Sequence, residues 1–551
     1  MRGTLLSDKL VARYMSAGYW DGSTIIDNIE NNLVAHPDDE AIVDARHRLT
    51  WGDVSDLTDT LGLAFHDLGI KRDQVVIIQL PNIVEHYLLV IAFRKAGIIS
   101  LCVPMTYRNS EMLHALRYLD AVGIIVPYKY RNFDYYEMVT VLSRETSALK
   151  CICVAGNDVP ADTISLNRLM ESRHGKNNND LFNGLRFGPW DVSQLISTSG
   201  TTGLPKFVEL AEAPLKCSGL GVIKQANATK DDVIGVLAPL SGAPGQLSWM
   251  AAPQIGAKTV LIDEQDSGKI LSILESERVS YLFSVPAQLI RLMRHNDLAN
   301  YDLGALRAVR TGGAPLEPSL ALEVEKQMRC QVLPSGGCSE VRGYGYITVN
   351  DPEPVRLSTL GKPPYGNKVM ICDDDGNQVC RGEVGEIWVT GAEMSQGYYR
   401  SMADTNEAFI EREDEIWYRT GDTGKVDEDG NLLVSGRIKD MILRGGQNIF
   451  PKEIEDILVG HPHIAAVAIV GMPDPAVGEK SCAYVVLEGG AGLTLSDVVL
   501  FLDGSGLARF KMPERLEIVE CLPVVSDIQK VDKKALRRDV EGKLRLEGKI
   551  R

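Results

Sequence analysis

The segment from Ser197 to Lys206 gathers the groups that would hold a chain of phosphates. It reads Ser-Thr-Ser-Gly-Thr-Thr-Gly-Leu-Pro-Lys, so hydroxyl donors, two glycines and one cation share a short stretch. The glycines let the backbone curl so that N–H groups point inward at an anion. The apolar run before it, Val192 to Ile196, predicts a strand that enters a flexible loop. We expect this loop to bind polyphosphate through Ser199, Gly200, Thr201, Thr202, Gly203 and Lys206.

This loop is not the common P-loop, in which a glycine is followed after four residues by Gly-Lys-Ser/Thr. Here Lys206 follows a proline instead. A polar surface loop between two strands is the alternative interpretation of a Ser/Thr/Gly cluster. The order of the residues, however, resembles the phosphate loop of the adenylate-forming (AMP-binding) enzymes. That family includes acyl-CoA synthetases, aryl-CoA ligases, peptide-synthetase adenylation domains and luciferases.

Other blocks of the sequence resemble the same family. They are Lys95–Pro104, Thr311–Pro315, Gly382–Gly391, Tyr418–Asp422, Gly445–Pro451 and Leu522–Lys534. The resemblance therefore covers nearly the whole chain. It implies an α/β fold with a large N-terminal AMP-binding domain and a small, mobile C-terminal α/β domain. The large domain is expected to hold two parallel-sheet subdomains and a small β-barrel subdomain.

The resemblance also implies a nucleotide site. Asp422 is expected to bind both ribose hydroxyls, a task that suits a carboxylate because it accepts two hydrogen bonds at once. A turn-capping aspartate is the alternative. Arg437 is expected beside the same ribose. The adenine is expected to lie against the backbone of Gly312, Gly313 and Ala314, with Ser339 close by.

Three charged residues are implied to act on the reacting groups. Lys530 matches the catalytic lysine of the family, which would neutralise charge between the attacking carboxylate and the α-phosphate of ATP. Taken alone, a lysine beside a basic helix is usually exposed. Lys206 would bear charge on the phosphates, and Glu340 is the candidate magnesium ligand because carboxylate oxygen suits a hard cation. The chemistry implied is attack of a carboxylic acid on ATP to give an acyl-adenylate, which a thiol then consumes.

The C-terminal part of the chain is implied to deliver that thiol. Lys439 matches the hinge about which the small domain turns in the family. Gly445, Gly446 and Gln447 resemble the loop that lines a tunnel for the pantetheine arm of coenzyme A. The cofactors implied are therefore ATP or a preformed acyl-AMP, Mg2+ and coenzyme A.

The sequence departs from the family where an aromatic ring normally stacks on adenine. The usual Tyr-Gly-x-Thr-Glu is replaced by Gly336-Gly-Cys-Ser-Glu340. The nearby Gly343-Tyr-Gly-Tyr346 is set aside as a substitute because it lies close to Gly361–Pro363 and no glutamate follows it. Phe207 stands where the phosphate loop normally has glycine, and Glu212 stands where histidine is common.

The acyl pocket is expected around the segments that carry these departures. Loss of side-chain bulk there suggests a pocket widened for a bulky alicyclic or aromatic acid, with no evident cation to pair a second carboxylate. The alternative is that adenylation is weakened and the enzyme uses a preformed acyl-adenylate. The expected lining is Pro239, Gly242, Gly245, Gly336 and Gly337.

Composition narrows the class of protein. The chain has 551 residues, 44% hydrophobic and 24% charged, which fits several globular domains. A formal net charge of −16 argues against general nucleic-acid binding. The start of the chain lacks an apolar signal core, no run of about 18 apolar residues occurs, and the ten cysteines are scattered. We expect a cytoplasmic protein without a membrane span.

Apolar runs and breakers suggest where the domains divide. Strands are expected at Val75–Leu80, Ile124–Val126 and Cys151–Val154, with a helix at Glu85–Lys95 between the first two. Asp373–Gly376 and Asp427–Gly430 are expected to be hairpin turns rather than calcium loops. The expected division is a large domain over 1–437, with subdomains of about 1–186, 187–355 and 356–437, and a small domain over 438–551.

The favoured function is an acyl-CoA ligase of the AMP-forming type, acting on a carboxylic acid, ATP and CoA. One alternative is a stand-alone adenylating enzyme that loads the thiol of a carrier protein. Another is a non-catalytic protein that binds a nucleotide or an acyl group, and a luciferase-type oxygenase is a remote fourth. The acid and the oligomeric state are left open, and a homodimer would be compatible with the sequence.

Overall fold

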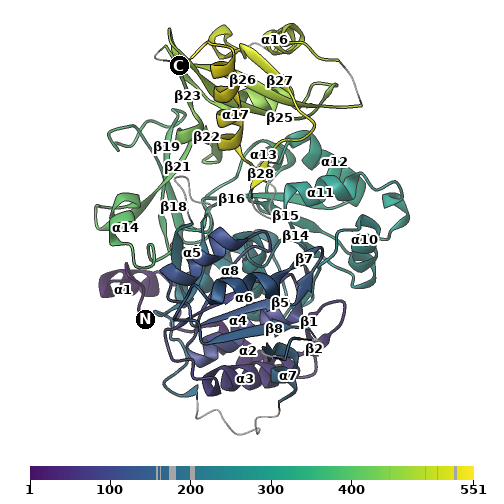
Figure 1. The fold of residues 1–551 in the computed structure, drawn as a ribbon, viewed down its shortest axis with the longest axis vertical. Helices are drawn as coiled ribbons and strands as arrows, with labels where there is room; N and C mark the ends of the chain where they lie inside the picture. Colours follow the sequence, from purple (N-terminus) through teal and green to yellow (C-terminus); the bar gives the residue numbers. More distant parts are fainter. Residues whose placement is uncertain are drawn as a thin grey trace.

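The structure, a computed structural model, describes most of the chain. The described residues are 1–156, 159–161, 163–172, 182–198, 205–314, 316–445, 447–489, 492–505, 507–525 and 530–550. Figure 1 shows the C-terminal segment, green to yellow, at one end of the long axis, and the two purple-to-teal sheets below it.

The first sheet carries the strand that enters the expected phosphate loop. Its strand order is β11-β10-β4-β3-β5-β8-β9, and every neighbouring pair is parallel except β10–β11. The strands are β3 (Val75–Ile78), β4 (Ile99–Cys102), β5 (Gly123–Pro127), β8 (Cys151–Ala155), β9 (Ile164–Ser165), β10 (Val192–Ser197) and β11 (Phe207–Ala211). Each of the three strands expected at Val75–Leu80, Ile124–Val126 and Cys151–Val154 is confirmed. Their fully apolar runs follow from burial on both faces, as parallel sheets require.

The second sheet has eight strands and carries the expected adenine and acyl segments. Its order is β17-β16-β15-β14-β12-β13-β1-β2. The strands are β1 (Glu40–Val43), β2 (Arg48–Thr50), β12 (Val233–Val236), β13 (Lys258–Leu261), β14 (Tyr281–Ser284), β15 (Ala308–Gly312), β16 (Gln331–Gly336) and β17 (Gly345–Tyr346). Strands β1 and β2 thus come from the first part of the chain, while β10 and β11 belong to the first sheet. The sheets therefore do not follow the boundary near residue 186, because parallel pairing joins strands that are far apart in sequence.

Helices cover both sheets and fill the space between them. All 13 residues of α4 (Val84–Ala96) are buried, and α3 (Trp51–Asp67), α8 (Glu212–Ala226) and α9 (Ala243–Ile255) contribute to the same core. The other helices of this part are α1 (Asp8–Ser16), α2 (Ile25–Ala35), α5 (Asn109–Tyr118), α6 (Tyr135–Ser143), α7 (Leu166–Glu171), α10 (Ser267–Ser276), α11 (Pro286–Met293), η2 (Leu298–Asn300), α12 (Pro318–Met328), α13 (Glu353–Ser358) and α14 (Met402–Ala408). Among the described residues, no helix is both long and apolar enough to cross a bilayer.

The third sheet confirms the antiparallel β subdomain. It contains β18 (Asn367–Cys372), β19 (Gly385–Gly391), β20 (Phe409–Arg412), β21 (Glu415–Val426) and β22 (Leu432–Arg437). Gly376 and Gly430 have φ of 80° and 87°, so both Asp-rich segments are tight turns, as expected.

The C-terminal segment forms an α/β unit with its own hydrophobic clusters. Its elements are η3 (Ile438–Asp440), β23 (Ile442–Arg444), β24 (Gln447–Ile449), α15 (Pro451–Leu458), β25 (Ile464–Asp474), β26 (Gly478–Leu487), α16 (Leu495–Gly504), η4 (Arg509–Lys511), β27 (Arg515–Ile518), β28 (Val524–Val525), β29 (Lys530–Val531) and α17 (Lys533–Leu546). The unit contacts the large domain: burial, together with the neighbouring Asp456 of α15, raises the pKa of Glu317 to about 7.

Two residues that depart from the family pattern, Phe207 and Glu212, are buried against the first sheet. Phe207 is buried and stacks on His114, with ring centroids 5.6 Å apart. Glu212 is fully buried at the start of α8, where its Oε1 accepts from Arg94 Nε at 2.7 Å and from the Ser193 hydroxyl. These residues are therefore explained by the core rather than by substrate chemistry.

We expect Glu212→Gln to lower the stability of the large domain by about 1–2 kcal/mol. The amide still accepts one hydrogen bond, but the charge-assisted part of the bond from buried Arg94 is lost. A shift of the urea midpoint at unchanged steepness measures the effect. Glu145→Gln, in the exposed pair with Arg117, is the control and should shift it far less. Equal shifts for the two variants would contradict the prediction.

Candidate active site

Asp422 and Arg437 lie opposite each other on the paired strands β21 and β22. Arg437 Nε donates to Asp422 Oδ1 at 2.8 Å. The Tyr344 hydroxyl donates to Asp422 Oδ2 at 2.9 Å. The carboxylate is 4% exposed, and each oxygen retains a second lone pair. The expected ribose ligand is thus held in place by two neighbours and can still accept hydrogen bonds.

Tyr344 also occupies the space beside Gly336, at the position where the family pattern has its aromatic ring. A Cβ atom added to Gly336 would lie 2.6 Å from Tyr344 Cε2 and 2.5 Å from Leu360 Cδ1. The segment Gly343–Tyr346, which the sequence led us to set aside, therefore brings a ring to this place. Arg342, two residues before Tyr344, has a φ of 59°, so the backbone turns back sharply here. This turn has no glycine or proline at its strained residue, which is why the sequence did not reveal it.

Lys530 reaches this group from the C-terminal segment, at the start of β29. Its amino group interacts electrostatically with Arg437, Asp422 and Lys439. Burial, with a further contribution from Arg437, lowers the pKa of Lys530 to about 8. Burial and Arg437 also lower the pKa of Lys439, which lies in η3 between the two domains. The structure thus brings together four of the residues expected from the sequence.

If Lys530 has the role expected from the sequence, its lowered pKa would make adenylation sensitive to pH. The charged ammonium is the form that would bear charge in the reaction, and it is lost as the pH rises through about 8. We expect kcat/KM for ATP in adenylation to fall above that pH, because this parameter reports the free enzyme. A profile from pH 6 to pH 10 measures it. Lys530→Arg should remove this fall, since arginine keeps its charge; an unchanged profile in that variant would contradict the assignment.

Glu340 and Lys206 are linked through Tyr398. The Tyr398 hydroxyl donates to Glu340 Oε1 at 2.8 Å, and Lys206 Nζ lies 4.9 Å from the centre of the Tyr398 ring. Lys206 also pairs with Asp404 at 2.6 Å. Within the described residues, no hydrogen bond engages Glu340 Oε2. One free oxygen on a buried carboxylate fits a magnesium ion that takes most of its remaining ligands from phosphates and water.

Cys338 joins the two halves of the site. Burial, together with Glu340 and Asp422, raises the pKa of its thiol well above the usual range. The thiol thus interacts electrostatically with both carboxylates. The raised pKa also keeps Cys338 protonated and argues against a nucleophilic role.

The expected adenine segment follows β15 at its C-terminal end. Gly312 is buried and packs against the Ser335 carbonyl oxygen, which would lie 2.9 Å from an added Cβ. Gly313 has a φ of 85°, and Ala314 and Ser339 are half-buried. This edge, at the C-terminal ends of parallel strands, is where open α/β sheets bind ligands. That Gly312, Gly313, Ala314 and Ser339 contact adenine remains a prediction.

Three of the four pocket glycines do not open a space. At Gly245 the carbonyl of Pro239 occupies the position of a side chain, at Gly337 the carbonyl of Arg342 does, and at Gly336 Tyr344 and Leu360 do. Only Gly242 has ordinary clearance, 3.6 Å to the nearest atom. The lack of side chains therefore allows close packing and does not by itself widen the pocket. A buried arginine, Arg342, packs its carbonyl against Gly337 in one of these segments.

The expected phosphate-loop residues 199–204 and the tunnel residue Gly446 lie outside the described residues. Gly445 and Gln447 are exposed in the hairpin between β23 and β24. The Gly445 amide donates to the Val477 carbonyl within the same domain, at 2.7 Å. The proposed tunnel role of this hairpin is therefore a prediction about a different domain arrangement.

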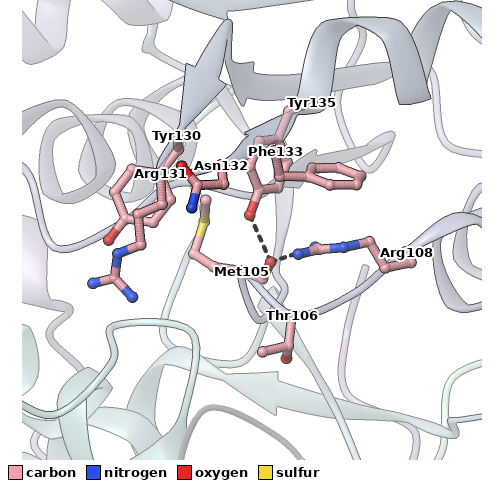
Figure 2. A pocket seen from close by; sticks show the side chains of 8 residues that line it. All are labelled: Met105, Thr106, Arg108, Tyr130, Arg131, Asn132, Phe133 and Tyr135. Atoms are coloured by element: carbon pink, nitrogen blue, oxygen red, sulfur yellow. Dashed lines mark hydrogen bonds between the residues drawn. The ribbon is translucent and has the colours of Figure 1, made fainter.

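Two of the cavities that the described residues form lie outside this site. One, of about 280 Å³, is drawn in Figure 2, where the Tyr135 hydroxyl and the Arg108 guanidinium both point at the Met105 carbonyl. The other, of about 720 Å³, includes Asp59 and Lys95 in its lining. Neither cavity is lined by a residue expected in the active site.

A possible metal cluster of Asp44, His47 and Glu85 is also satisfied by the chain itself. Arg46 Nη2 donates to both oxygens of Glu85, at 2.7 and 2.8 Å. Asp44 accepts from the backbone amides of Arg46, His47 and Val84. These carboxylates already have donors, so the cluster is better explained as structural.

Comparisons with known proteins agree with this geometry. The chain is 30% identical over 541 residues to the 2-hydroxy-7-methoxy-5-methyl-1-naphthoate–CoA ligase of Streptomyces carzinostaticus, covering 96% of this chain and 95% of that protein. It is 30% identical over 550 residues to a salicyl-AMP ligase/salicyl-S-ArCP synthetase of Mycobacterium tuberculosis, covering 96% and 93%. A crystal structure of an anthranilate CoA ligase with anthranoyl-AMP has a TM-score of 0.84 at 21% identity, covering 95% of this chain and 98% of that one.

The family models fall on the two parts of the fold described above. The AMP-binding enzyme model matches residues 29–399, and the model of the AMP-binding enzyme C-terminal domain matches residues 453–526. The first match alone spans more than half of the chain. The protein belongs to the AMP-binding family of adenylate-forming enzymes.

Proposed function

We propose that this protein is an AMP-forming acid–thiol ligase that converts an aromatic carboxylic acid into its CoA thioester. The observation that carries the proposal is the position of Lys530, which the C-terminal segment places next to Asp422 and Arg437. A cation there interacts with the two residues expected to bind the ribose. The names of the two relatives support an aromatic acid and, for one of them, CoA as the acceptor.

The first step is adenylation. A carboxylate oxygen of the acid attacks the α-phosphorus of ATP, a new O–P bond forms, and the bond to pyrophosphate breaks. Asp422 and Arg437 hold the ribose, so that the α-phosphate is fixed, and Lys530 stabilises the charge that develops on it. Glu340, with Lys206 nearby, would hold a magnesium ion, which when bound neutralises phosphate charge.

The second step forms the thioester. The sulfur of coenzyme A, after losing its proton, attacks the acyl carbon, and the bond from that carbon to AMP breaks. We propose that the small domain turns about Lys439 between the steps, which would bring Gly445 and Gln447 to the thiol channel. In the present arrangement Lys530 occupies the site, which is the arrangement suited to adenylation.

The test is thioester formation followed by mass spectrometry in two parallel reactions. One contains benzoic, hydroxybenzoic, naphthoic and alicyclic acids with ATP, Mg2+ and CoA; the other supplies the matching acyl-adenylates with CoA alone. Products in both reactions support a complete ligase. Product only from the adenylates means that the first step is lost, and no product in either contradicts the proposal.

A carrier-protein thiol is the second candidate acceptor, because one relative is named as a salicyl-S-ArCP synthetase. This second candidate function differs from the CoA ligase function only in the group that accepts the acyl chain. Adenylation measured by ATP–pyrophosphate exchange, without any CoA thioester, would favour it over CoA. Absence of exchange with every acid would instead favour a protein that binds nucleotides without turnover.

A further inference from the structure

A buried polar cluster lies behind the expected acyl pocket and has no role in the mechanism above. It consists of Arg342, Glu393, Gln246, Arg310 and Tyr346, which are all between 0% and 4% exposed. Arg342 and Tyr346 follow Glu340, Gln246 lies in α9, Arg310 lies in β15, and Glu393 follows β19. Charged groups are rarely buried so completely unless they are paired.

Three members of this cluster have buried polar atoms without a hydrogen-bond partner, and one of these atoms is the Tyr346 hydroxyl. Arg342 Nε and Nη2 are buried without a hydrogen-bond partner, and Nη1 has only a long contact, 3.4 Å, to Gln246 Oε1. Both carboxylate oxygens of Glu393 also lack a partner. Within the described part of the chain, no ion pair shorter than 4.0 Å joins the two residues, although they interact electrostatically. The cluster thus holds an unused donor edge and an unused acceptor that interact electrostatically.

Arg310 differs from Arg342 because its guanidinium group has interaction partners. Its Nε donates to Gln225 Oε1 at 3.0 Å, and its guanidinium lies 4.9 Å from the centre of the Tyr346 ring. With two arginines and one glutamate, the cluster has a formal charge of +1. Burial raises the pKa of Glu393 well above its usual range.

The cluster adjoins both segments expected to line the acyl pocket. The carbonyl of Arg342 packs against Gly337. Gln246 lies in the first turn of α9, where its backbone N–H donates to the Gly242 carbonyl at 3.0 Å. Arg342 and Gln246 are therefore the cluster members that contact the segments expected to line the pocket.

We propose that Arg342, Gln246 and Glu393 form a subsite for a ring hydroxyl group on the aromatic acid. This inference rests on the proposed function and names the substrate class more closely. A hydroxyl accepts from Arg342 and donates to Glu393, so it satisfies both groups without adding charge. A second carboxylate would use the donor edge of Arg342 but would face Glu393. An unsubstituted ring would leave both groups unpaired, and a site built to bind a hydroxyl discriminates strongly against an analogue that lacks it.

The test uses stable analogues of the acyl-adenylate, so that binding is separated from turnover. The probes are the 5′-O-(N-acylsulfamoyl)adenosines of benzoic, 3-hydroxybenzoic, 4-hydroxybenzoic and isophthalic acids, with Kd measured by calorimetry on the full chain. We expect at least one hydroxybenzoyl probe to bind about tenfold or more tightly than the benzoyl probe. Equal binding of the benzoyl and both hydroxybenzoyl probes, or tightest binding of the isophthaloyl probe, overturns the subsite.

Arg342→Met should abolish the hydroxyl preference and leave the Kd of the benzoyl probe within about threefold. The control is Arg356→Met, which removes another buried arginine, paired with Glu325 at 2.8 Å, and should leave the preference unchanged. A loss of affinity that is equal for all probes in Arg342→Met would mean that Arg342 is only structural.

Glu393→Gln gives a readout that misfolding cannot produce. It replaces the carboxyl group with an amide whose N–H can donate to a second carboxylate, so we expect the isophthaloyl probe to bind at least about tenfold more tightly than it binds the unaltered protein. If the isophthaloyl probe binds this variant no more tightly than the unaltered protein, the role of Glu393 is overturned. If the benzoyl probe binds but hydroxyls give no advantage, the subsite fails and the ligase proposal stands. If no probe binds, the ligase proposal itself fails.

Discussion

Lys530→Ala is expected to slow adenylation by about 10²–10³-fold while leaving thioester formation from a preformed acyl-adenylate within about threefold. The reason is that the lysine faces Asp422 and Arg437 in this arrangement and would leave the site when the small domain turns. An interaction made only in the first transition state affects only the first half-reaction. ATP–pyrophosphate exchange measures the first step, and CoA thioester formation from the adenylate measures the second.

The matched control is Lys534→Ala, four residues further along the chain. Lys534 is exposed at the start of α17. Its substitution by alanine removes the same charge from the same region of the sequence. It should leave both half-reactions unchanged. A Lys530→Ala variant with normal exchange, or with both half-reactions slowed equally, would remove the lysine from its assigned role.

Tyr344→Ala is expected to raise KM for ATP by about 10- to 100-fold, the usual value of one aromatic ring stacked on a base. Its ring lies beside Gly336 and its hydroxyl holds Asp422, so the truncation removes a flat surface and frees the carboxylate. Tyr344→Phe keeps the ring and should lose much less, about threefold. Steady-state kinetics at saturating acid separates KM from kcat.

A reciprocal exchange makes this test sharper. Gly336→Phe alone should be damaging, because an added Cβ would already lie 2.6 Å from Tyr344 Cε2. In the double variant Gly336→Phe/Tyr344→Ala, the new ring replaces the old one, and we expect KM for ATP to return to within about tenfold of the original. If the double variant is worse than either single one, the two positions do not share one ring site.

The sequence predicted those elements whose signals are local. The apolar run Val75–Leu80 is typical of a buried strand, and Asp427–Gly430 is typical of a hairpin turn, so β3 and the β21–β22 turn were found. The C-terminal α/β unit was expected from the family resemblance instead. Pairing between distant strands has no local signal, and so the addition of β1 and β2 to the second sheet was missed.

The candidate site shows the same division. Asp422, Arg437, Lys439 and Lys530 were named from their motifs, and the structure places them together. Tyr344 was set aside because no glutamate follows it, and Arg342 was missed because the positive φ of 59° falls on a residue other than glycine. The glycines were misjudged for the opposite reason. A missing side chain suggests space, but at Gly245, Gly336 and Gly337 a neighbouring atom needs that space.

The interleaving of the two large sheets limits how this protein can be divided. A cut near residue 186 would leave one fragment with β1 and β2 but without β13, and the other with β10 and β11 but without β4. Neither fragment could complete a sheet, so the two sheets must assemble as one cooperative unit. The C-terminal strands β23 to β27, by contrast, pair only among themselves in the described part of the chain. A break after Arg437 would therefore separate two pieces that each keep every strand partner, which makes this junction the natural site for exchanging small domains between relatives.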